Sequence, residues 1–187
     1  SADMHAMELP AELKAIGRAG AGTNNIPVEK CAEAGIVVFN TPGANANAVR
    51  ELVIAGLLLS GRDIIGGIQW AYGLKGQGAA VAKMVEKGKN QFVGPELKGK
   101  RLGIVGMGAI GVLVANAAVG LDMKVYGYDP FMSVDAALHL TRQVTRVDDM
   151  DTLFAECDYV TLHLPLNGQT RGMVNSTRLG MMKEGSV

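Results

Sequence analysis

Residues 101–111, RLGIVGMGAIG, place closely spaced glycines between two apolar runs, a pattern that suits phosphate binding. Gly106, Gly108 and Gly111 match G-x-G-x-x-G between a predicted strand and a predicted helix. The first is expected to make a tight turn, the second to let a pyrophosphate approach the backbone, and the third to allow close packing of helix on strand. A plain flexible turn is the alternative, because glycine makes up 25 of the 187 residues.

An acid at the end of the next predicted strand strengthens the first interpretation. Asp129 ends KVYGYD, at the position where a carboxylate accepts hydrogen bonds from the adenosine ribose. It would repel a 2′-phosphate, and no arginine follows in DPFMS, so NAD is expected rather than NADP. The N–H groups at Ala109 and Ile110 would contact the phosphates. The alternative for Asp129 is an ordinary turn acid before Pro130.

These groups need a sheet to bring them together. From residue 101 onward, strands alternate with helices (102–106, 109–121, 124–129, 148–157 and 158–165), which predicts a doubly wound parallel sheet. Upstream, a strand near 13–20, a helix from Pro27 to Gly35 and a strand over 36–40 predict a parallel pair. Residues 48–65 predict one helix buried on several sides, and residues 68–100 an extended arm containing a short helix.

Composition argues against several functions. Eighteen basic and eighteen acidic residues give zero formal net charge, so no global field attracts nucleic acid or an anionic membrane. The longest apolar run, residues 52–59, is too short to span a bilayer, and no export leader opens the chain. Cys31 and Cys157 have no metal-ligand spacing and are expected to be packed, reduced thiols of a cytoplasmic protein.

Acids and histidines outside the glycine motif receive structural interpretations. Asp148, Asp149 and Asp151 are expected to cap a helix rather than bind metal, and no metal motif is present. His5 and His139 have no acid or nucleophile at a meaningful spacing and are expected to lie on the surface.

The motifs GIVGMGAIG, GYDP and DYVTLHLPLNGQTRGMVN, with AIGRAGAGTNNIPVEKCAEAGIVVFNTPGANANAVRELVIAGLLL upstream, resemble the D-2-hydroxyacid dehydrogenase family. The resemblance implies an α/β fold: an incomplete Rossmann-type doubly wound sheet in residues 44–187, with the interdomain helix and dimer arm. A piece of a flavodoxin-like substrate domain, residues 1–43, would precede it. It also implies NAD-dependent oxidation of a D-2-hydroxy acid. The likeness is greatest to members that oxidise 3-phosphoglycerate to 3-phosphohydroxypyruvate in serine biosynthesis.

The resemblance also assigns residues around a substrate and a cofactor. RAGAG would bind the substrate carboxylate through backbone N–H groups, with Arg18 facing a substrate phosphate, and a glycine-rich turn can form an anion-binding nest. A plain turn and an ion-paired arginine are the alternatives. HLP would pack against the adenosine half of NAD, with a structural rather than catalytic histidine. The residues concerned are Arg18, Ala19, Gly20 and Ala21 for substrate, and His163, Leu164, Pro165 and Thr170 for cofactor.

Some relatives carry threonine where Ala21 stands, so a hydroxyl contact there is not expected. The family's catalytic arginine, histidine and supporting acid lie in motifs that find no match in these residues. We therefore expect a fragment of a longer enzyme, inactive alone and without a catalytic residue of its own, that forms a homodimer or higher homo-oligomer. The alternatives are an NAD-sensing, corepressor-like module and a dehydrogenase for another acid such as glycerate or lactate.

Overall fold

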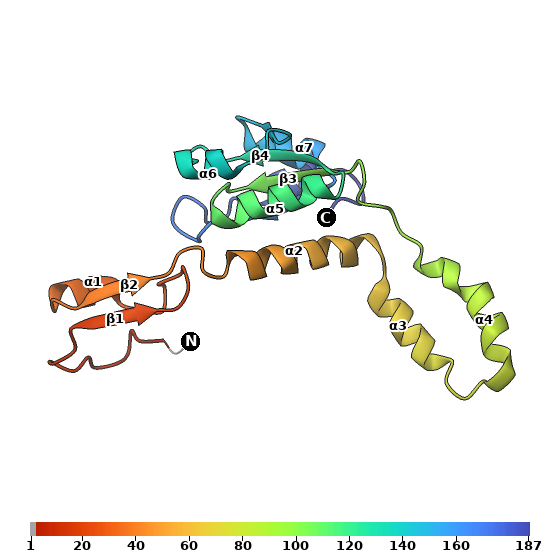
Figure 1. Ribbon diagram of the computed structural model, residues 1–187, viewed down its shortest axis with the longest axis horizontal. Helices are drawn as coiled ribbons and strands as arrows, with labels where there is room; N and C mark the ends of the chain where they lie inside the picture. Colours follow the sequence, from red (N-terminus) through yellow and green to blue (C-terminus); the bar gives the residue numbers. More distant parts are fainter. Residues whose placement is uncertain (1–2) are drawn as a thin grey trace.

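The computed structural model describes residues 3–187, which contain a two-stranded and a four-stranded parallel sheet (Figure 1). The four-stranded sheet runs β5-β4-β3-β6. The chain proceeds outward from β3 to β4 and β5, then crosses to β6 on the other side of β3, so the strand order reverses between β3 and β6. The strands are β3 (Arg101–Val105), β4 (Lys124–Tyr128), β5 (Thr145–Arg146) and β6 (Tyr159–Leu162).

Helices cover both faces of this sheet, as the alternation of side chains along β3 requires. Leu102 and Ile104 pack in one cluster with residues of α5 (Ala109–Gly120), while Val105 packs in another with Leu153 and Cys157 at α7 (Met150–Glu156). Successive side chains of a strand point to opposite faces, so an apolar run such as β3 is buried on both. Figure 1 shows α5 between the sheet and α2 (Ala46–Gly61).

The doubly wound prediction is confirmed, but three short elements had not been predicted. These are β5, α6 (Val134–His139) and α8 (Ser176–Met181). The two helices have six residues each and no buried side chain, so they show no apolar period. Their N-caps were the available signal: Ser133 Oγ accepts a hydrogen bond from Ala136 N, and Asn175 Oδ1 from Arg178 N.

The prediction of a single helix over 48–65 is wrong, because the helix ends at Gly61 and a second helix begins at Ile64. The first is α2, Arg62 after it is extended, and α3 (Ile64–Gly73) begins with Asp63 as its N-cap, accepting from Gly66 N at 2.8 Å. Burial of α2 on several sides is not observed within the described chain and stays a prediction for a subunit contact. Leu57 is buried toward α5, whereas Leu52 on another face is 74% exposed.

The extended arm expected over 68–100 is instead a projecting helical hairpin (Figure 1). Its two arms are α3 and α4 (Val81–Gly88), the latter flanked by 3-10 turns at Gly78–Ala80 and Lys89–Phe92. The rings of Trp70 and Phe92 join the arms, with centroids 5.4 Å apart. None of the helices in residues 3–187 is long and apolar enough to cross a membrane.

The N-terminal unit has the predicted strand–helix–strand order. The strands β1 (Ala15–Arg18) and β2 (Val37–Asn40) are parallel and connected through α1 (Val28–Glu33). Ile26, Cys31 and Ile36 form a small core of their own. The domain boundary at residues 43 and 44 stays a prediction.

Candidate nucleotide-binding site

The loop after β3 gives each glycine of the motif a separate physical role. Gly106 has φ +94°, and a Cβ there would lie 2.7 Å from the carbonyl oxygen of His163. A Cβ at Gly111 would lie 2.0 Å from the carbonyl oxygen of Gly106, so only glycine lets α5 start this close to the strand end. A Cβ at Gly108 would meet nothing within 4 Å. Gly108 is therefore not required by the fold around it, which agrees with a place kept open for a ligand.

The first turn of α5 presents backbone donors at the carboxyl edge of the sheet. Gly108 is the N-cap and supplies no side chain to the turn, and the first intrahelical bond runs from Val112 N to Gly108 O at 3.0 Å. The N–H groups at Ala109, Ile110 and Gly111 precede that bond. Together with the positive end of the helix dipole, these groups suit a pyrophosphate.

Asp129 is bound directly to the glycine loop, a contact that the sequence did not reveal. Its Oδ2 accepts a hydrogen bond from Met107 N and its Oδ1 from Phe131 N, each at 2.8 Å. Each carboxylate oxygen has a second lone pair, so both remain able to accept from ribose hydroxyls. The carboxylate that would accept hydrogen bonds from the ribose thus also holds the glycine loop in place.

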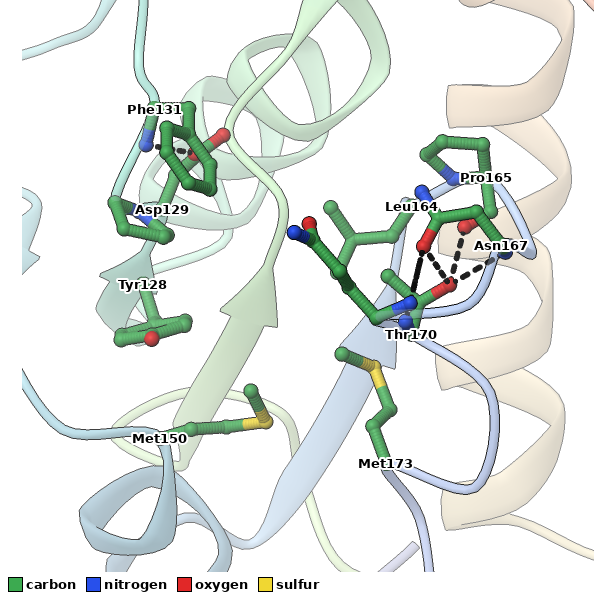
Figure 2. A pocket seen from close by; sticks show the side chains of 11 residues that line it. Tyr128, Asp129, Phe131, Met150, Leu164, Pro165, Asn167, Thr170 and Met173 are labelled. Carbon is green, nitrogen blue, oxygen red and sulfur yellow. Dashed lines mark hydrogen bonds between the residues drawn. The ribbon is translucent and has the colours of Figure 1, made fainter.

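A pocket of about 400 Å³ opens beside Asp129, between the loops that follow β4 and β6 (Figure 2). Most of its wall is apolar, which suits the flat face of a nucleobase next to the ribose acid. Figure 2 shows Met150 and Met173 projecting into it from opposite walls. The lining residues are Tyr128, Asp129, Pro130, Phe131, Met150, Leu164, Pro165, Asn167, Gln169, Thr170 and Met173.

Hydrogen bonds within the loop hold one wall of this pocket. Thr170 Oγ1 donates to Pro165 O at 2.6 Å and accepts from Asn167 N at 2.9 Å, and Thr170 N donates to Asn167 Oδ1 at 3.0 Å. The hydroxyl of Thr170 therefore closes the loop on itself. Leu164 and Pro165 line the pocket as the resemblance implied, although their contact with a cofactor stays a prediction.

His163 directly follows β6, and the structure gives its ring a structural partner. His163 N donates to Val105 O at 2.8 Å, and its Nε2 lies 3.1 Å from Thr161 Oγ1. Burial lowers the pKa of His163 below its ordinary value of 6.5, which favours the neutral form of the ring. This geometry agrees with the structural interpretation of the histidine.

The RAGAG loop is folded on itself in this structure. The Arg18 guanidinium donates to Ala19 O, and its Nε is buried without a partner. Gly20, at φ +134°, donates its N–H to Thr41 Oγ1 at 2.8 Å, and Asn40 Nδ2 donates to Ala21 O at 2.8 Å. The expected anion donor at Gly20 is thus already engaged, and a carboxylate would have to displace Thr41.

The connection between the two units runs close to the glycine loop. A Cβ at Gly43 would lie 3.7 Å from the Cβ of Ala109, and both residues line a second pocket of about 420 Å³. The structure therefore brings the start of α2 against the N-terminus of α5. Arg18, Ala19, Gly20 and Ala21 line neither this pocket nor the one beside Asp129.

The predicted capping role is confirmed for Asp149, whereas Asp148 is exposed and pairs with Arg146 instead. Asp149 is the N-cap of α7 and accepts from Asp151 N at 3.2 Å and Thr152 N at 3.1 Å. The hydrogen bonds to this carboxylate, from Asp151 N first and then from Thr152, lower the pKa of Asp149. Cys31 and Cys157 are both free and buried, and burial raises the pKa of Cys157 to about 11.

Sequence reasoning missed several of the residues that line the pocket beside Asp129. Met150 and Met173 were not singled out, because an isolated methionine in a sequence is equally suited to a protein core. Asn167 carried a signal that was available, since an asparagine in a Gly-containing loop favours side-chain bonds to nearby N–H groups.

The fold and the site together define a Rossmann-type dinucleotide-binding domain. Three loops at the carboxyl edge supply uncapped helix donors, an acid bound to the glycine loop, and an apolar pocket. The family model described as "D-isomer specific 2-hydroxyacid dehydrogenase, NAD binding domain" matches residues 72–187. The chain belongs to this family, and these residues form its NAD-binding domain.

Relatives of known name agree on the family but differ in substrate. The chain is 36% identical over 181 residues to D-3-phosphoglycerate dehydrogenase of Methanocaldococcus jannaschii, covering 97% of this chain and 32% of that protein. It is 38% identical over 184 residues to hydroxypyruvate reductase of Thermotoga maritima, covering 97% and 54%. The chain thus spans about a third to a half of these relatives' length.

A solved structure supports the same assignment. The NAD⁺-bound 3-phosphoglycerate dehydrogenase of Entamoeba histolytica superposes with a TM-score of 0.68 and 34% identity. The match covers 92% of this chain and 46% of that one.

Proposed function

We propose that this chain provides the cofactor half of an NAD-dependent dehydrogenase that oxidises 3-phosphoglycerate to 3-phosphohydroxypyruvate, a step of serine biosynthesis. The observation that carries the proposal is the hydrogen bond from Met107 N to Asp129 Oδ2, which joins phosphate loop and ribose acid in one unit. When bound, NAD accepts the hydride that leaves the substrate carbon. The chain's own residues bind and orient the cofactor.

Each part of the cofactor has a group that would hold it. The N–H groups of Ala109 and Ile110 would donate to the pyrophosphate, and Gly108 leaves room for it. Asp129 would accept from the adenosine ribose, and the adenine would lie between Met150 and Met173. The apolar wall would exclude water from the base. The His163 ring, which contacts Thr161, is proposed to have a structural rather than a catalytic role.

The choice of a phosphorylated acid rests on Arg18. Relatives that act on different acids have similar identity, so identity alone does not choose between them. Within residues 3–187 the Arg18 guanidinium donates to Ala19 O and its Nε lacks a partner, so rotation toward a phosphate would satisfy this group. The unit carrying Arg18 is proposed to belong to a flavodoxin-like substrate domain.

The proposal is tested by turnover of the native polypeptide that contains this sequence. We expect NAD⁺ reduction, followed at 340 nm, to be faster with D-3-phosphoglycerate than with D-glycerate or D-lactate. Arg18→Met is expected to raise KM for the phosphorylated acid alone. Preference for an unphosphorylated acid would reject the substrate. Cofactor binding without turnover of any acid would favour the NAD-sensing module instead.

We also propose that a second copy of the chain covers α2 and the hairpin. Apolar side chains lie exposed along these helices, among them Leu52 at 74%, Ile65 at 60% and Tyr72 at 76%. A surface of this kind is typical of a subunit interface. Light scattering at micromolar concentration is expected to give a dimer, and a monomer would reject this part of the proposal. A cytoplasmic location, in keeping with the two free cysteines, completes the proposal.

A further inference from the structure

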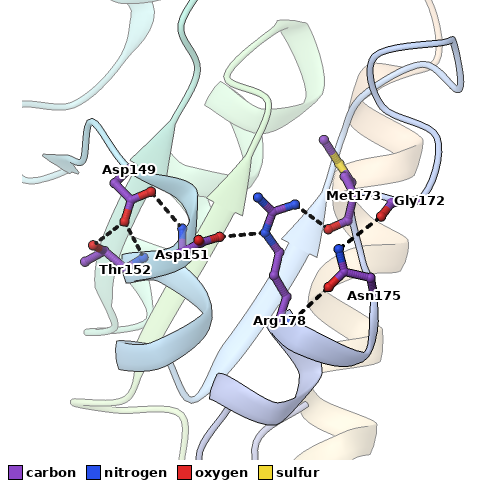
Figure 3. A network of polar contacts seen from close by, with 7 residues as sticks. All are labelled: Asp149, Asp151, Thr152, Gly172, Met173, Asn175 and Arg178. Carbon is purple, nitrogen blue, oxygen red and sulfur yellow. Dashed lines mark hydrogen bonds and ion pairs between the residues drawn. The ribbon is translucent and has the colours of Figure 1, made fainter.

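The two methionines of the nucleotide pocket belong to different parts of the chain, and one arginine is bonded to both parts. Met150 opens α7, while Met173 lies in the loop between β6 and α8. Arg178 Nε donates to Asp151 Oδ1 at 2.6 Å, and Arg178 Nη1 donates to Met173 O at 2.5 Å (Figure 3). The guanidinium also lies over the ring of Phe154, 6.0 Å from its centroid.

The two hydrogen bonds of the Arg178 guanidinium hold Met173 itself and the residue that follows Met150. Asp151 follows Met150 directly, and its N–H is bound to Asp149 Oδ1 at 3.2 Å, so this first turn of α7 is held on two sides. Met173 is likewise held twice, since its N–H donates to Thr170 O at 3.2 Å and its carbonyl accepts from Arg178. Planar guanidinium donors in a fixed fork suit a bridge between two acceptors.

We infer that Arg178 and Asp151 form a clamp that sets the spacing between Met150 and Met173 and so positions the adenine end of the cofactor. The inference rests on the proposed placement of adenine between these methionines. Flat rings gain from many weak contacts at about 3.5–4 Å, and a gap of about 0.5–1 Å forfeits a quarter to a half of each. A small separation of the walls therefore weakens adenine binding without touching the phosphate loop.

The clamp is more a positioning device than a source of stability. The Arg178 side chain is 24% exposed and that of Asp151 45%, and ion pairs at such partly exposed sites add little to folding. The chain offers a matched control in Lys183, which donates to Asp158 Oδ1 at 3.0 Å. Asp158 immediately precedes β6, so this ion pair lies at the amino edge of the sheet, away from the pocket.

The test compares cofactor fragments by calorimetry on the 187-residue chain. AMP probes the adenine pocket, and reduced nicotinamide mononucleotide probes the other half of the site. We expect Arg178→Met to raise the Kd for AMP about tenfold, equal to about 1.4 kcal/mol, and to leave the mononucleotide within twofold. Arg178→Lys, which keeps the charge but only one of the two bonds, is expected to recover part of the loss, and Lys183→Met to change neither Kd.

Asp151→Ala provides a second way to open the clamp, and it should reproduce the selective loss of AMP binding. Unchanged AMP affinity in Arg178→Met or Asp151→Ala would reject the proposed clamp. Equal losses of affinity for AMP and for the mononucleotide would also reject it. Failure of the unsubstituted chain to bind AMP would instead reject the placement of adenine, and the clamp with it. A loss confined to AMP and partly restored by lysine would support it.

Discussion

Two glycine-rich loops, 18–22 and 106–111, adjoin the ends of parallel strands, yet they present their backbone donors differently. In the second loop, α5 begins directly after Gly108, so its first N–H groups point out of the strand end. In the first loop, α1 begins at Val28, and the donor of Gly20 is already bonded to Thr41. The comparison teaches that an anion-binding loop depends on where the following helix starts. The helix supplies the free N–H groups, whereas glycine only allows the backbone to turn.

The largest expected effect tests whether glycine is obligatory in the second loop. Gly111→Ala would place its Cβ 2.0 Å from the Gly106 carbonyl oxygen, and backbone cannot move aside cheaply. We expect a loss of about 3 kcal/mol of unfolding free energy, measured by urea denaturation. Gly17→Ala is the counterpart before the first loop; its Cβ would meet nothing within 4 Å, and stability should change by less than about 1 kcal/mol. Similar losses for both variants would contradict the comparison.

The next effect separates binding from folding. Gly108→Val adds a side chain where the structure has open space, so folding should be preserved while the pyrophosphate is kept from the backbone. Fluorescence titration is expected to show an NADH Kd raised about tenfold to a hundredfold, or about 1.4–2.8 kcal/mol. Gly22→Val in the first loop, whose nearest neighbour would be Asn24 at 3.5 Å, should leave NADH binding unaltered. If Gly108→Val left the NADH Kd unchanged, the proposed pyrophosphate site at this loop would be rejected.

A smaller effect concerns cofactor choice. The chain should bind NADH more tightly than NADPH. Asp129→Ala should reduce this difference in Kd, because it removes the carboxylate that accepts from ribose hydroxyls and repels a 2′-phosphate. Weakening of NADH binding by about tenfold is expected, since hydrogen bonds to charged groups contribute about 1.5–3 kcal/mol. Asp148→Ala, an exposed acid nearby, serves as the control. Equal affinity of the unsubstituted chain for both cofactors would refute this role for Asp129.

The smallest effect is a pH dependence at His163. Its folded pKa is depressed by burial, so the unfolded chain takes up a proton more readily. The associated stability is present above pH 6.5 and is lost as pH falls through the folded pKa. His163→Gln should flatten the decline of the unfolding free energy, measured by urea denaturation, as pH falls below 6.5. His5→Gln, at an exposed position of the N-terminal unit, should leave the decline as it was; an unaltered slope in His163→Gln would contradict the prediction.

Regular elements were the predictable part of the fold, because burial on both faces leaves apolar runs such as β3 in the sequence. The break after Gly61 was not predicted, since the apolar pattern continues across it and only the cap at Asp63 marks a new helix. Helices α6 and α8 left no apolar signal because they bury no residue. The hairpin was misjudged because its polar, glycine-rich sequence conceals the pairing of Trp70 with Phe92.

By itself, the sequence determined the glycine spacing, the acid after the next strand and the alternation of strands and helices, because these are local patterns fixed by turn geometry and side-chain period. The tertiary structure alone decided which groups meet. The bond from Met107 N to Asp129, the engagement of Gly20 by Thr41 and the bridge of Arg178 between two walls join residues that are distant in sequence or lie on separate elements. Such contacts depend on how β3, β4 and β6 converge at one edge, which no single segment encodes.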